Sequence, residues 1–367
     1  MVSRRIKVAF VGSGAVAAMD YFPALELDAV RERLEPVAVC DVAPERAKAA
    51  AESFGFPEVY TSLDDLLARS SAEAVVLLTP IPFHFAQASA ALAAGRHVYV
   101  QKTITTTYAE AAALVEQAAS LGLVLAAAPG QMLDPAHQAA RDLIRRGVVG
   151  KVCFARGHGS HPGHERVNTY GADPTWYYRP GGGPVMDVAV YPLHSLTGLL
   201  GSVKRVTAFS GVALANRAWR GQPIDVQMDD NTLLLLDFGE SVFAEVNGTF
   251  CRSAYNTPQI ELYAEKGVVQ LGGWALRDVP LEVFVEGDPL GLVGAGAPGI
   301  AKGWYRPQGL TPALKHTVAD LVHFVDCVRD GTKPVNSAAQ AAHVVEVIEK
   351  GYIAAKSGQA QSVESTF

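Results

Sequence analysis

An apolar segment that runs directly into a glycine-rich loop constrains this chain more than any other stretch. Residues 8–11 are apolar, and residues 12–17 read Gly-Ser-Gly-Ala-Val-Ala. This is the G-x-G-x-x-A form of the dinucleotide-binding fingerprint, placed between a strand and a helix-forming stretch. Gly12 permits a tight turn, Gly14 lets the backbone approach a pyrophosphate, and Ala17 lets the helix pack closely on the strand. An ordinary strand–helix turn, or another nucleotide-using fold such as a methyltransferase, is the alternative. We expect cofactor contacts from Gly12, Ser13, Gly14, Ala15 and Val16.

Length, charge and cysteine usage narrow the class of protein. A chain of 367 residues predicts two domains, and a formal net charge of −6 argues against nucleic-acid binding. The four cysteines form no C-x-x-C pair, which predicts reduced thiols and neither a disulfide framework nor a zinc site. We see no signal peptide and no apolar run of membrane-spanning length. We therefore expect a cytoplasmic protein with neither a nucleic-acid nor a membrane partner.

The first half alternates strand and helix patterns up to about residue 128, which predicts a doubly wound parallel sheet. The second strand ends at Asp41, where a carboxylate accepts hydrogen bonds from the adenosine ribose hydroxyls and repels a 2′-phosphate. Asp41 therefore favours NAD over NADP, although Arg46 could still meet a phosphate. A helix cap ahead of Pro44 is the simpler interpretation of Asp41. The helical pattern over residues 21–33 is expected to account for the long spacing between the loop and Asp41.

A lysine follows another strand of this half. Residues 97–100 are strand-like, and Lys102 comes just past their carboxyl end, where ligands gather in open α/β sheets. After Pro129 the pattern changes to successive strands with few helices, which predicts an antiparallel sheet. Strands are expected over 151–156, 203–212, 232–238, 241–250, 259–271 and 281–286, a long loop over 287–309, and helices over 134–147, 314–329 and 338–356.

Three histidines crowd one loop of the second half. His158, His161 and His164 have a spacing that permits a metal site, but Pro162 and the adjacent glycines prevent a regular helix from aligning them. We therefore predict a polar, substrate-facing loop with no metal, and assign His161 to substrate binding. The loop leads to Trp176 and Arg179. The aromatic faces of this segment would suit the C–H faces of a sugar ring, and ordinary packing under a loop is an equally good interpretation.

A second group of candidate catalytic side chains follows at residues 187–194. On a regular helix Asp187, Tyr191 and His194 share one face, although Pro192 requires the helix to begin or bend near Tyr191. An aspartate cap with a core tyrosine is the structural alternative.

Together these motifs resemble the Gfo/Idh/MocA (glucose–fructose oxidoreductase/inositol dehydrogenase) family. The resemblance rests on the glycine loop, Thr79-Pro-x-x-x-His84, Gly95-x-His97, Gln101-Lys102-Thr103, Gly181-Gly-Gly-x-x-x-Asp187 and the tail from Ser337. It implies an N-terminal Rossmann domain, residues 1–128, and a C-terminal α+β domain, residues 129–367, with a large, mainly antiparallel sheet. We also expect the helices over 314–329 and 338–356 to return to the first domain. In that pattern Thr79, His84, Gln101 and Lys102 lie at the cofactor.

This chain departs from the family pattern at three places. Gln101-Lys102-Thr103 stands where Glu-Lys-Pro is usual, Ile81 stands where Asn is frequent, and Tyr191 stands where many members carry histidine. Losing the glutamate removes a charge beside the cofactor, and losing the proline alters the turn that aims the lysine. Because Lys102 is retained, the chemistry is not excluded, and nicotinamide binding is expected to be retuned.

The resemblance implies an NAD-dependent oxidoreductase, with NADP the less favoured cofactor, that acts on a secondary alcohol or ketone of a sugar, inositol or related polyol. Lys102, Asp187, Tyr191 and His194 would be catalytic. Lys102 would stabilise an alkoxide, Tyr191 would move the proton, and His194, which also contacts substrate, would compete for that role. A family hydrolase that uses NAD transiently and a non-enzymatic dinucleotide-binding regulator are the alternatives. We also expect a homodimer or homotetramer, because the strand at residues 233–236 is apolar on both faces.

Overall fold

The computed structural model describes residues 4–167, 171–272, 280–286 and 302–367, and the chain divides into two compact units. The first unit comprises residues 1–130, 168–173 and 314–346, and the second comprises residues 131–167, 174–313 and 347–367. The division cuts helix α10 after Glu346.

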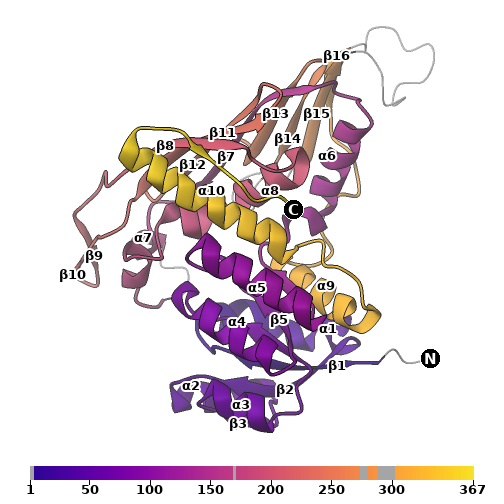
Figure 1. The fold of residues 1–367 in the computed structure, drawn as a ribbon, viewed down its shortest axis with the longest axis vertical. Helices are drawn as coiled ribbons and strands as arrows, with labels where there is room; N and C mark the ends of the chain where they lie inside the picture. Colours follow the sequence, from indigo (N-terminus) through magenta and orange to yellow (C-terminus); the bar gives the residue numbers. More distant parts are fainter. Residues whose placement is uncertain (1–3, 168–170, 273–279, 287–301) are drawn as a thin grey trace. The chain divides into compact units, whose positions relative to one another are not determined.

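The first unit is built on a six-stranded parallel sheet in the order β3-β2-β1-β4-β5-β6. Figure 1 labels β1, β2, β3 and β5 of this sheet. Apolar side chains cover both of its faces, as the continuous apolar runs of its strands require. Helices α4 and α5 pack on one face, and α9 packs on the other beside the glycine loop's helix. The expected doubly wound sheet is confirmed. Its strands are β1 (Ile6–Val11), β2 (Leu34–Cys40), β3 (Glu58–Tyr60), β4 (Ala74–Leu77), β5 (His97–Val100) and β6 (Leu125–Ala127). Its helices are η1 (Ala17–Tyr21), η2 (Pro23–Glu26), α1 (Asp28–Arg31), α2 (Pro44–Phe54), α3 (Leu63–Arg69), η3 (Ile81–Phe83), α4 (His84–Ala93), α5 (Tyr108–Leu121) and α9 (His316–Asp330).

The helical stretch expected over residues 21–33 is broken into pieces. After a π-helical turn, η1, a 3-10 turn starts at Pro23 and a single α-turn follows at α1. The N–H of Phe22 bonds the carbonyl of Ala17 and closes the π-turn. Pro23 lacks a backbone N–H and its ring clashes with the preceding turn, so the α-helix cannot continue through it.

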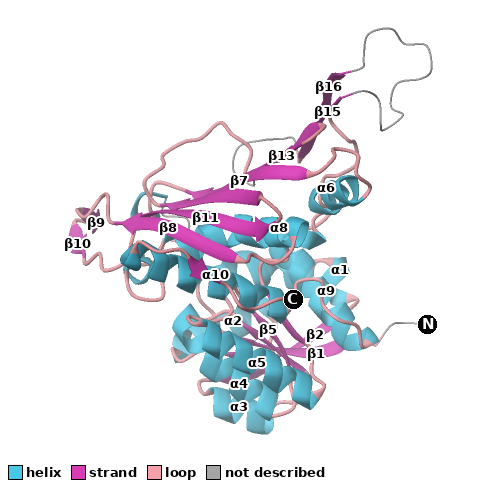
Figure 2. Ribbon diagram, turned by 45° about the horizontal axis from the view of Figure 1, so that its top comes forward, coloured by secondary structure: helices cyan, strands magenta, loops and turns pink. Residues whose placement is uncertain are grey.

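The second unit is built on a nine-stranded sheet in the order β16-β15-β14-β13-β7-β12-β11-β8-β17. Every pairing in it is antiparallel except β7 with β12, so the mainly antiparallel sheet is confirmed. Figure 2 shows helices on one face of this sheet, where α8 packs against β7 and β13. The strands are β7 (Val152–Ser160), β8 (Arg205–Gly211), β11 (Asn231–Gly239), β12 (Val242–Thr249), β13 (Ile260–Ala264), β14 (Gly267–Leu271), β15 (Leu281–Glu286), β16 (Lys302–Tyr305) and β17 (Gln361–Ser362). A separate hairpin pairs β9 (Arg217–Trp219) with β10 (Gln222–Ile224).

The helices of the second unit are mostly short. Its longest, α10 (Ala338–Ser357), begins in the first unit. The others are η4 (Gln131–Leu133), α6 (Pro135–Arg145), α7 (His164–Val167), η5 (Thr175–Tyr178), η6 (Val185–Ala189) and α8 (Val190–Leu200). Among the residues that the structure describes, no helix is both long enough and apolar enough to cross a bilayer.

Two expectations for this unit were wrong in detail. The strand expected over residues 259–271 is a hairpin, β13 and β14, because the chain reverses at Glu265 and Lys266 and Ala264 pairs with Gly267. The loop expected over residues 287–309 contains strand β16, whose Trp304 pairs with Phe284 of β15. The remainder of that loop up to residue 301 lies outside the described residues.

Candidate active site

Three neighbouring strands of the first unit end at one edge of the sheet. The order β1-β4-β5 places the loops that begin at Gly12, Leu78 and Gln101 side by side. In an open α/β sheet this carboxyl edge, next to the point where strand order reverses, is where ligands bind. The fold therefore gathers the glycine loop, Thr79 and Lys102 at one place.

The glycine loop has the geometry that a phosphate needs. Gly12 has φ +97°, and a Cβ there would lie 2.9 Å from the carbonyl carbon of Leu78. A Cβ on Gly14 would meet no atom within 4 Å, so this glycine faces open space. The Ser13 hydroxyl is buried and has no hydrogen-bond partner among the described residues. A close backbone approach and an unsatisfied hydroxyl beside the start of a helix fit a dinucleotide pyrophosphate.

Asp41 stands at the end of β2 and organises the loop next to it. Its Oδ2 accepts the N–H of Ser13 (2.8 Å), and its Oδ1 accepts the N–H of Ala43 (2.9 Å) and Nη2 of Arg46 (2.7 Å). Burial pushes the pKa of Asp41 up, but the bonds from Arg46, Ala43 and Ser13 outweigh it and hold the pKa below its ordinary value. The carboxylate is therefore ionised at neutral pH, and Oδ2 can accept one more hydrogen bond.

His84 joins two of the loops at this edge. Its ring is fully buried, with Nδ1 2.8 Å from the carbonyl oxygen of Thr103 and Nε2 2.7 Å from that of Thr79. The structure thus places His84 behind the site, where it connects the loop after β4 to the segment after Lys102. Burial lowers the pKa of His84 even though both carbonyls favour its protonated form. Thr79 also donates its hydroxyl hydrogen to Gln87.

Gln101 and Lys102 follow β5 directly. The Gln101 side chain is buried, and its carboxamide oxygen accepts the backbone N–H of Lys102. The peptide bond between Lys102 and Thr103 is cis. The hydrogen bond from its own N–H to buried Gln101 holds the backbone that carries the lysine.

In the second unit, close backbone packing fixes the helix that carries Asp187. A Cβ on Gly159 of β7 would lie 2.1 Å from the carbonyl oxygen of Val188, so only glycine permits this approach. Asp187 belongs to the π-turn η6, and Tyr191 and His194 belong to α8, which continues it. The π-turn ends and the α-helix begins at Val190, so Pro192 lies in the first α-helical turn, where proline is tolerated. All three side chains are buried or nearly so.

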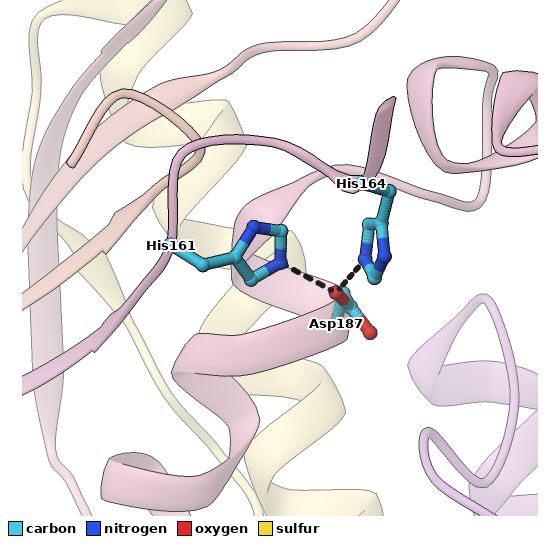
Figure 3. Close-up of side chains that lie close together, drawn as sticks. All are labelled: His161, His164 and Asp187. Atoms are coloured by element: carbon cyan, nitrogen blue, oxygen red, sulfur yellow. Dashed lines mark hydrogen bonds and ion pairs between the residues drawn. The ribbon is translucent and has the colours of Figure 1, made fainter. Parts of the chain in front are cut away.

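Asp187 meets two imidazoles (Figure 3). Nε2 of His164 donates to its Oδ2 at 2.6 Å, and Nε2 of His161 lies 3.6 Å from the same oxygen. The side chain of His164 is 12% exposed, that of His161 is 15% exposed and that of Asp187 is 6% exposed. His158, the third histidine of the loop, lies in β7, and burial and nearby Arg252 lower its pKa to about 4.

One hydrogen bond in this cluster argues against a metal ion on His161. The N–H of Gly163 donates to Nδ1 of His161 at 3.0 Å, so the proton of the neutral imidazole sits on Nε2, facing Asp187. A metal on Nε2 would instead require a proton on Nδ1, which metal-binding histidines donate to a second partner. The three groups lie within 4.8 Å of one another, as metal ligands would. In the structure Asp187 is hydrogen-bonded to His164, and His161 Nε2 is buried without a hydrogen-bond partner among the described residues. The absence of a metal stays a prediction.

A buried ion-pair network holds the segment that carries His164. Arg217 of β9 reaches Glu165 of α7 (2.7 Å) and Asp230 (2.8 Å), and Tyr178 donates to Glu165. The Arg217 side chain is 2% exposed. Because Glu165 directly follows His164, this network fixes the backbone from which the imidazole reaches Asp187.

An aromatic stack adjoins the cluster. The ring of Tyr177 lies parallel to that of His164, with centroids 3.4 Å apart, and Trp176 packs on Tyr177 at 3.8 Å. Arg179, at the end of η5, is exposed. Half-buried aromatic faces of this kind suit the C–H faces of a sugar ring.

Sequence reasoning did not single out three residues that shape the site. His164 was seen only as part of the histidine loop, although its three-residue spacing from His161 was a usable signal. Tyr177 and Arg217 carry no local signal, because their partners lie outside their own segments of the sequence.

The parallel sheet, the glycine loop and the acidic residue after β2 define a dinucleotide-binding Rossmann protein with a second α+β unit. Residues 6–128 match the model of an oxidoreductase family with an NAD-binding Rossmann fold, and residues 137–270 match the GFO/IDH/MocA C-terminal domain. The chain belongs to the GFO/IDH/MocA oxidoreductase family.

Several characterised proteins are similar to this chain. A dTDP-3,4-didehydro-2,6-dideoxy-alpha-D-glucose 3-reductase of Streptomyces violaceoruber is 33% identical over 60% of the chain, a match that spans 64% of the reductase. The D-glucoside 3-dehydrogenase of Escherichia coli is 27% identical over 65% of the chain and 68% of the relative. The scyllo-inositol 2-dehydrogenase (NAD(+)) of Bacillus subtilis is 22% identical over 94% of the chain and 93% of the relative.

Solved structures share the fold over almost the whole chain. A levoglucosan dehydrogenase in complex with NADH and levoglucosan has a TM-score of 0.81 and 20% identity, covering 99% of this chain and 100% of its own. An NAD-binding oxidoreductase from Klebsiella pneumoniae has a TM-score of 0.83 and 19% identity, covering 98% and 99%. At sequence identities of this level, the structural similarity establishes the fold of this chain and nothing beyond it.

Proposed function

We propose that this protein is an NAD-dependent dehydrogenase or ketoreductase that acts on a secondary alcohol or ketone of a sugar or cyclic polyol. The observation that carries the proposal is that Lys102 follows β5 at the same carboxyl edge of the dinucleotide-binding sheet as the glycine loop after β1, with β4 between the two strands. The relatives act on sugar derivatives or on an inositol, as their names state, which supports the same substrate class here.

The chemistry assigns a separate role to each residue. NAD, when bound, supplies the acceptor for a hydride from the carbinol carbon. Lys102, as a cation, would donate a hydrogen bond to the substrate oxygen and stabilise its developing negative charge. Tyr191 would take up the hydroxyl proton, with His194 as the competitor for that role. Asp187, fixed by His164, would orient the proton-transfer group or the substrate.

We also propose NAD as the preferred cofactor. Asp41 is ionised, its Oδ2 has room for a ribose hydroxyl, and its charge would repel a 2′-phosphate. Arg46, which could have met such a phosphate, is bonded to Asp41.

We further propose that the face of the nine-stranded sheet on which Leu233 and Leu235 are exposed joins two copies of the chain. Along β11 the leucines alternate: Leu234 and Leu236 are buried, whereas Leu233 and Leu235 are exposed. Leu233 pairs with Phe209 of β8, which is 80% exposed. A contiguous apolar patch of this kind is typical of an interface.

A substrate panel tests the function. Sugars, inositols and their keto forms would be assayed with NAD(H) and NADP(H), following the near-ultraviolet absorbance of the reduced nicotinamide. Steady absorbance change with a sugar or polyol is the expected result. Release of free sugar without net absorbance change would instead show a hydrolase, and tight cofactor binding with neither signal would show a regulator.

A further inference from the structure

A chain of buried polar side chains leads from Lys102 into the core of the first unit. The Gln101 carboxamide accepts the N–H of Lys102 and donates to the Tyr21 hydroxyl at 3.0 Å. The Tyr21 oxygen lies 3.0 Å from the Tyr99 hydroxyl, and Tyr99 donates to Oδ2 of Asp320 at 3.2 Å. The four side chains come from η1, β5, the residue after β5, and α9.

The donors and acceptors of this chain allow one direction of hydrogen bonding. The amide nitrogen of Gln101 can only donate, and an ionised Asp320 can only accept. Tyr99 must then give its hydrogen to Asp320, and Tyr21 must give its own to Tyr99. The N–H of Gly130 donates to the same Asp320 oxygen at 3.1 Å.

The identity of residue 101 matters for this order. A glutamate there, as in the usual family pattern, would place an acceptor at each end of the chain. Tyr21 and Tyr99 would then each donate outward, and their oxygens would face each other at 3.0 Å with no hydrogen between them. Gln101 and Asp320 are thus matched as the donor end and the acceptor end.

The acceptor end can lose its charge. Asp320 is 1% exposed, and its Oδ1 is buried without a partner among the described residues. Burial raises the pKa of Asp320 to about 7, against the opposing bonds from Gly130 and Tyr99. A protonated Asp320 can itself donate a hydrogen bond, so Tyr99 is no longer required to donate to it. The hydrogen bonds from Gln101 to Asp320 then no longer have a single direction.

Among the described residues, the charged groups flanking α9 form ion pairs, and the Lys102 cation also acts on His316 of that helix. On α9, burial and Lys315 lower the pKa of His316 to about 4, and Nε2 of His323 accepts the N–H of Val335. The ion pairs that flank the helix are Lys315 with Asp20 of η1 and Arg33 with Asp326, and Arg31 of α1 pairs with Glu26 of η2.

We propose that Tyr21, Tyr99 and Asp320 are positioning residues for Lys102: ionised Asp320 sets the direction of the hydrogen-bond chain, and the chain holds Gln101 against the Lys102 backbone. The proposal rests on the proposed function, in which Lys102 contacts the reacting oxygen.

Three variants test this. Tyr99→Phe interrupts the chain, Asp320→Asn keeps an acceptor oxygen but cannot ionise, and Tyr60→Phe removes a hydroxyl that donates to Glu58 in the same unit and serves as the matched control. We expect Tyr99→Phe to lower kcat by about 2- to 10-fold, the effect of one lost hydrogen bond, with the KM for NAD unchanged. We expect kcat of the unmodified enzyme to rise as pH increases through about 7, and Asp320→Asn to lack that inflection.

The outcomes separate this inference from the proposed function. If Tyr99→Phe matches Tyr60→Phe in kcat while its melting temperature falls, the chain of hydrogen bonds has only a structural role and the inference is wrong. If Tyr99→Phe does not fold, the isosteric Asp320→Asn decides: an inflection that survives overturns the inference. Lys102→Met is measured in parallel, and normal turnover in that variant would overturn the proposed function itself.

Discussion

Replacing Asp41 with serine should change which dinucleotide this protein prefers. Oδ2 of Asp41 accepts only the Ser13 N–H among the described contacts, so one site remains for a ribose hydroxyl. A hydrogen bond to a charged group is worth about 1.5–3 kcal/mol. At about 1.4 kcal/mol for each factor of ten, Asp41→Ser should weaken NAD binding by about 10- to 100-fold.

The same change should improve NADP binding. It removes the negative charge that faces a 2′-phosphate and releases Arg46, whose side chain is 57% exposed. NADH and NADPH would be titrated against both proteins by calorimetry. Arg46→Ala is the control, since it keeps the carboxylate and should keep the NAD preference. Tighter NADPH binding by the unmodified protein, or equal weakening of both cofactors in Asp41→Ser, would refute the reasoning.

The preference for NAD over NADP should depend on pH through the charge of Asp41. Because the folded-state pKa of Asp41 lies below its ordinary value, its charge is present throughout the neutral range. The preference should therefore be constant above the ordinary aspartate pKa and be lost only as pH falls through the lowered one.

Three further predictions concern proton transfer, stability and assembly. Tyr191→Phe should cut kcat steeply with little change in substrate KM, whereas His194→Ala should chiefly raise KM; the reverse pattern in steady-state kinetics would assign proton transfer to His194. Arg217→Met should lower the free energy of unfolding by about 3–5 kcal/mol, because it leaves the buried carboxylates of Glu165 and Asp230 unpaired. The exposed pair of Arg205 with Asp237 is the matched comparison, where Arg205→Met should cost under about 1 kcal/mol in denaturant unfolding, and equal costs would contradict the assignment. Leu233→Glu should dissociate the oligomer in sedimentation whereas Leu121→Glu should not, and an unmodified protein that sediments as a 38.9 kDa monomer would exclude the sheet interface.

The sequence was most informative where local chemistry dictates structure. Gly12 needs its positive φ whatever surrounds it, and the apolar strands can only be buried on both faces, so the Rossmann unit was predictable. The sheet of the second unit followed from strands without intervening helices. The hairpin turn at Glu265 and Lys266 and the strand at β16 were missed, because neither carries a strong local signal.

The site was less predictable because its partners are distant in the sequence. Asp187 and His164 are 23 residues apart, and their contact depends on Gly159, which lets η6 pack against β7. The hydrogen-bond chain from Gln101 to Asp320 joins residues more than 200 positions apart, so no short sequence spacing could reveal it. The α-helix begins at Val190, in agreement with the start near Tyr191 that Pro192 predicted, and Asp187 lies in a π-turn that the sequence did not indicate.

Lys102→Met gives the most direct measurement of the central claim. Lys102 follows a strand end and its charge is assigned to a substrate oxygen, not to the core. Cofactor affinity, from NADH titration, should therefore remain within a few-fold of the unmodified value. Turnover on the best substrate of the panel should fall about a hundredfold or more, the range expected when a charge that stabilises the transition state is removed. Turnover close to that of the unmodified enzyme, in a folded variant that binds NADH, would contradict the account.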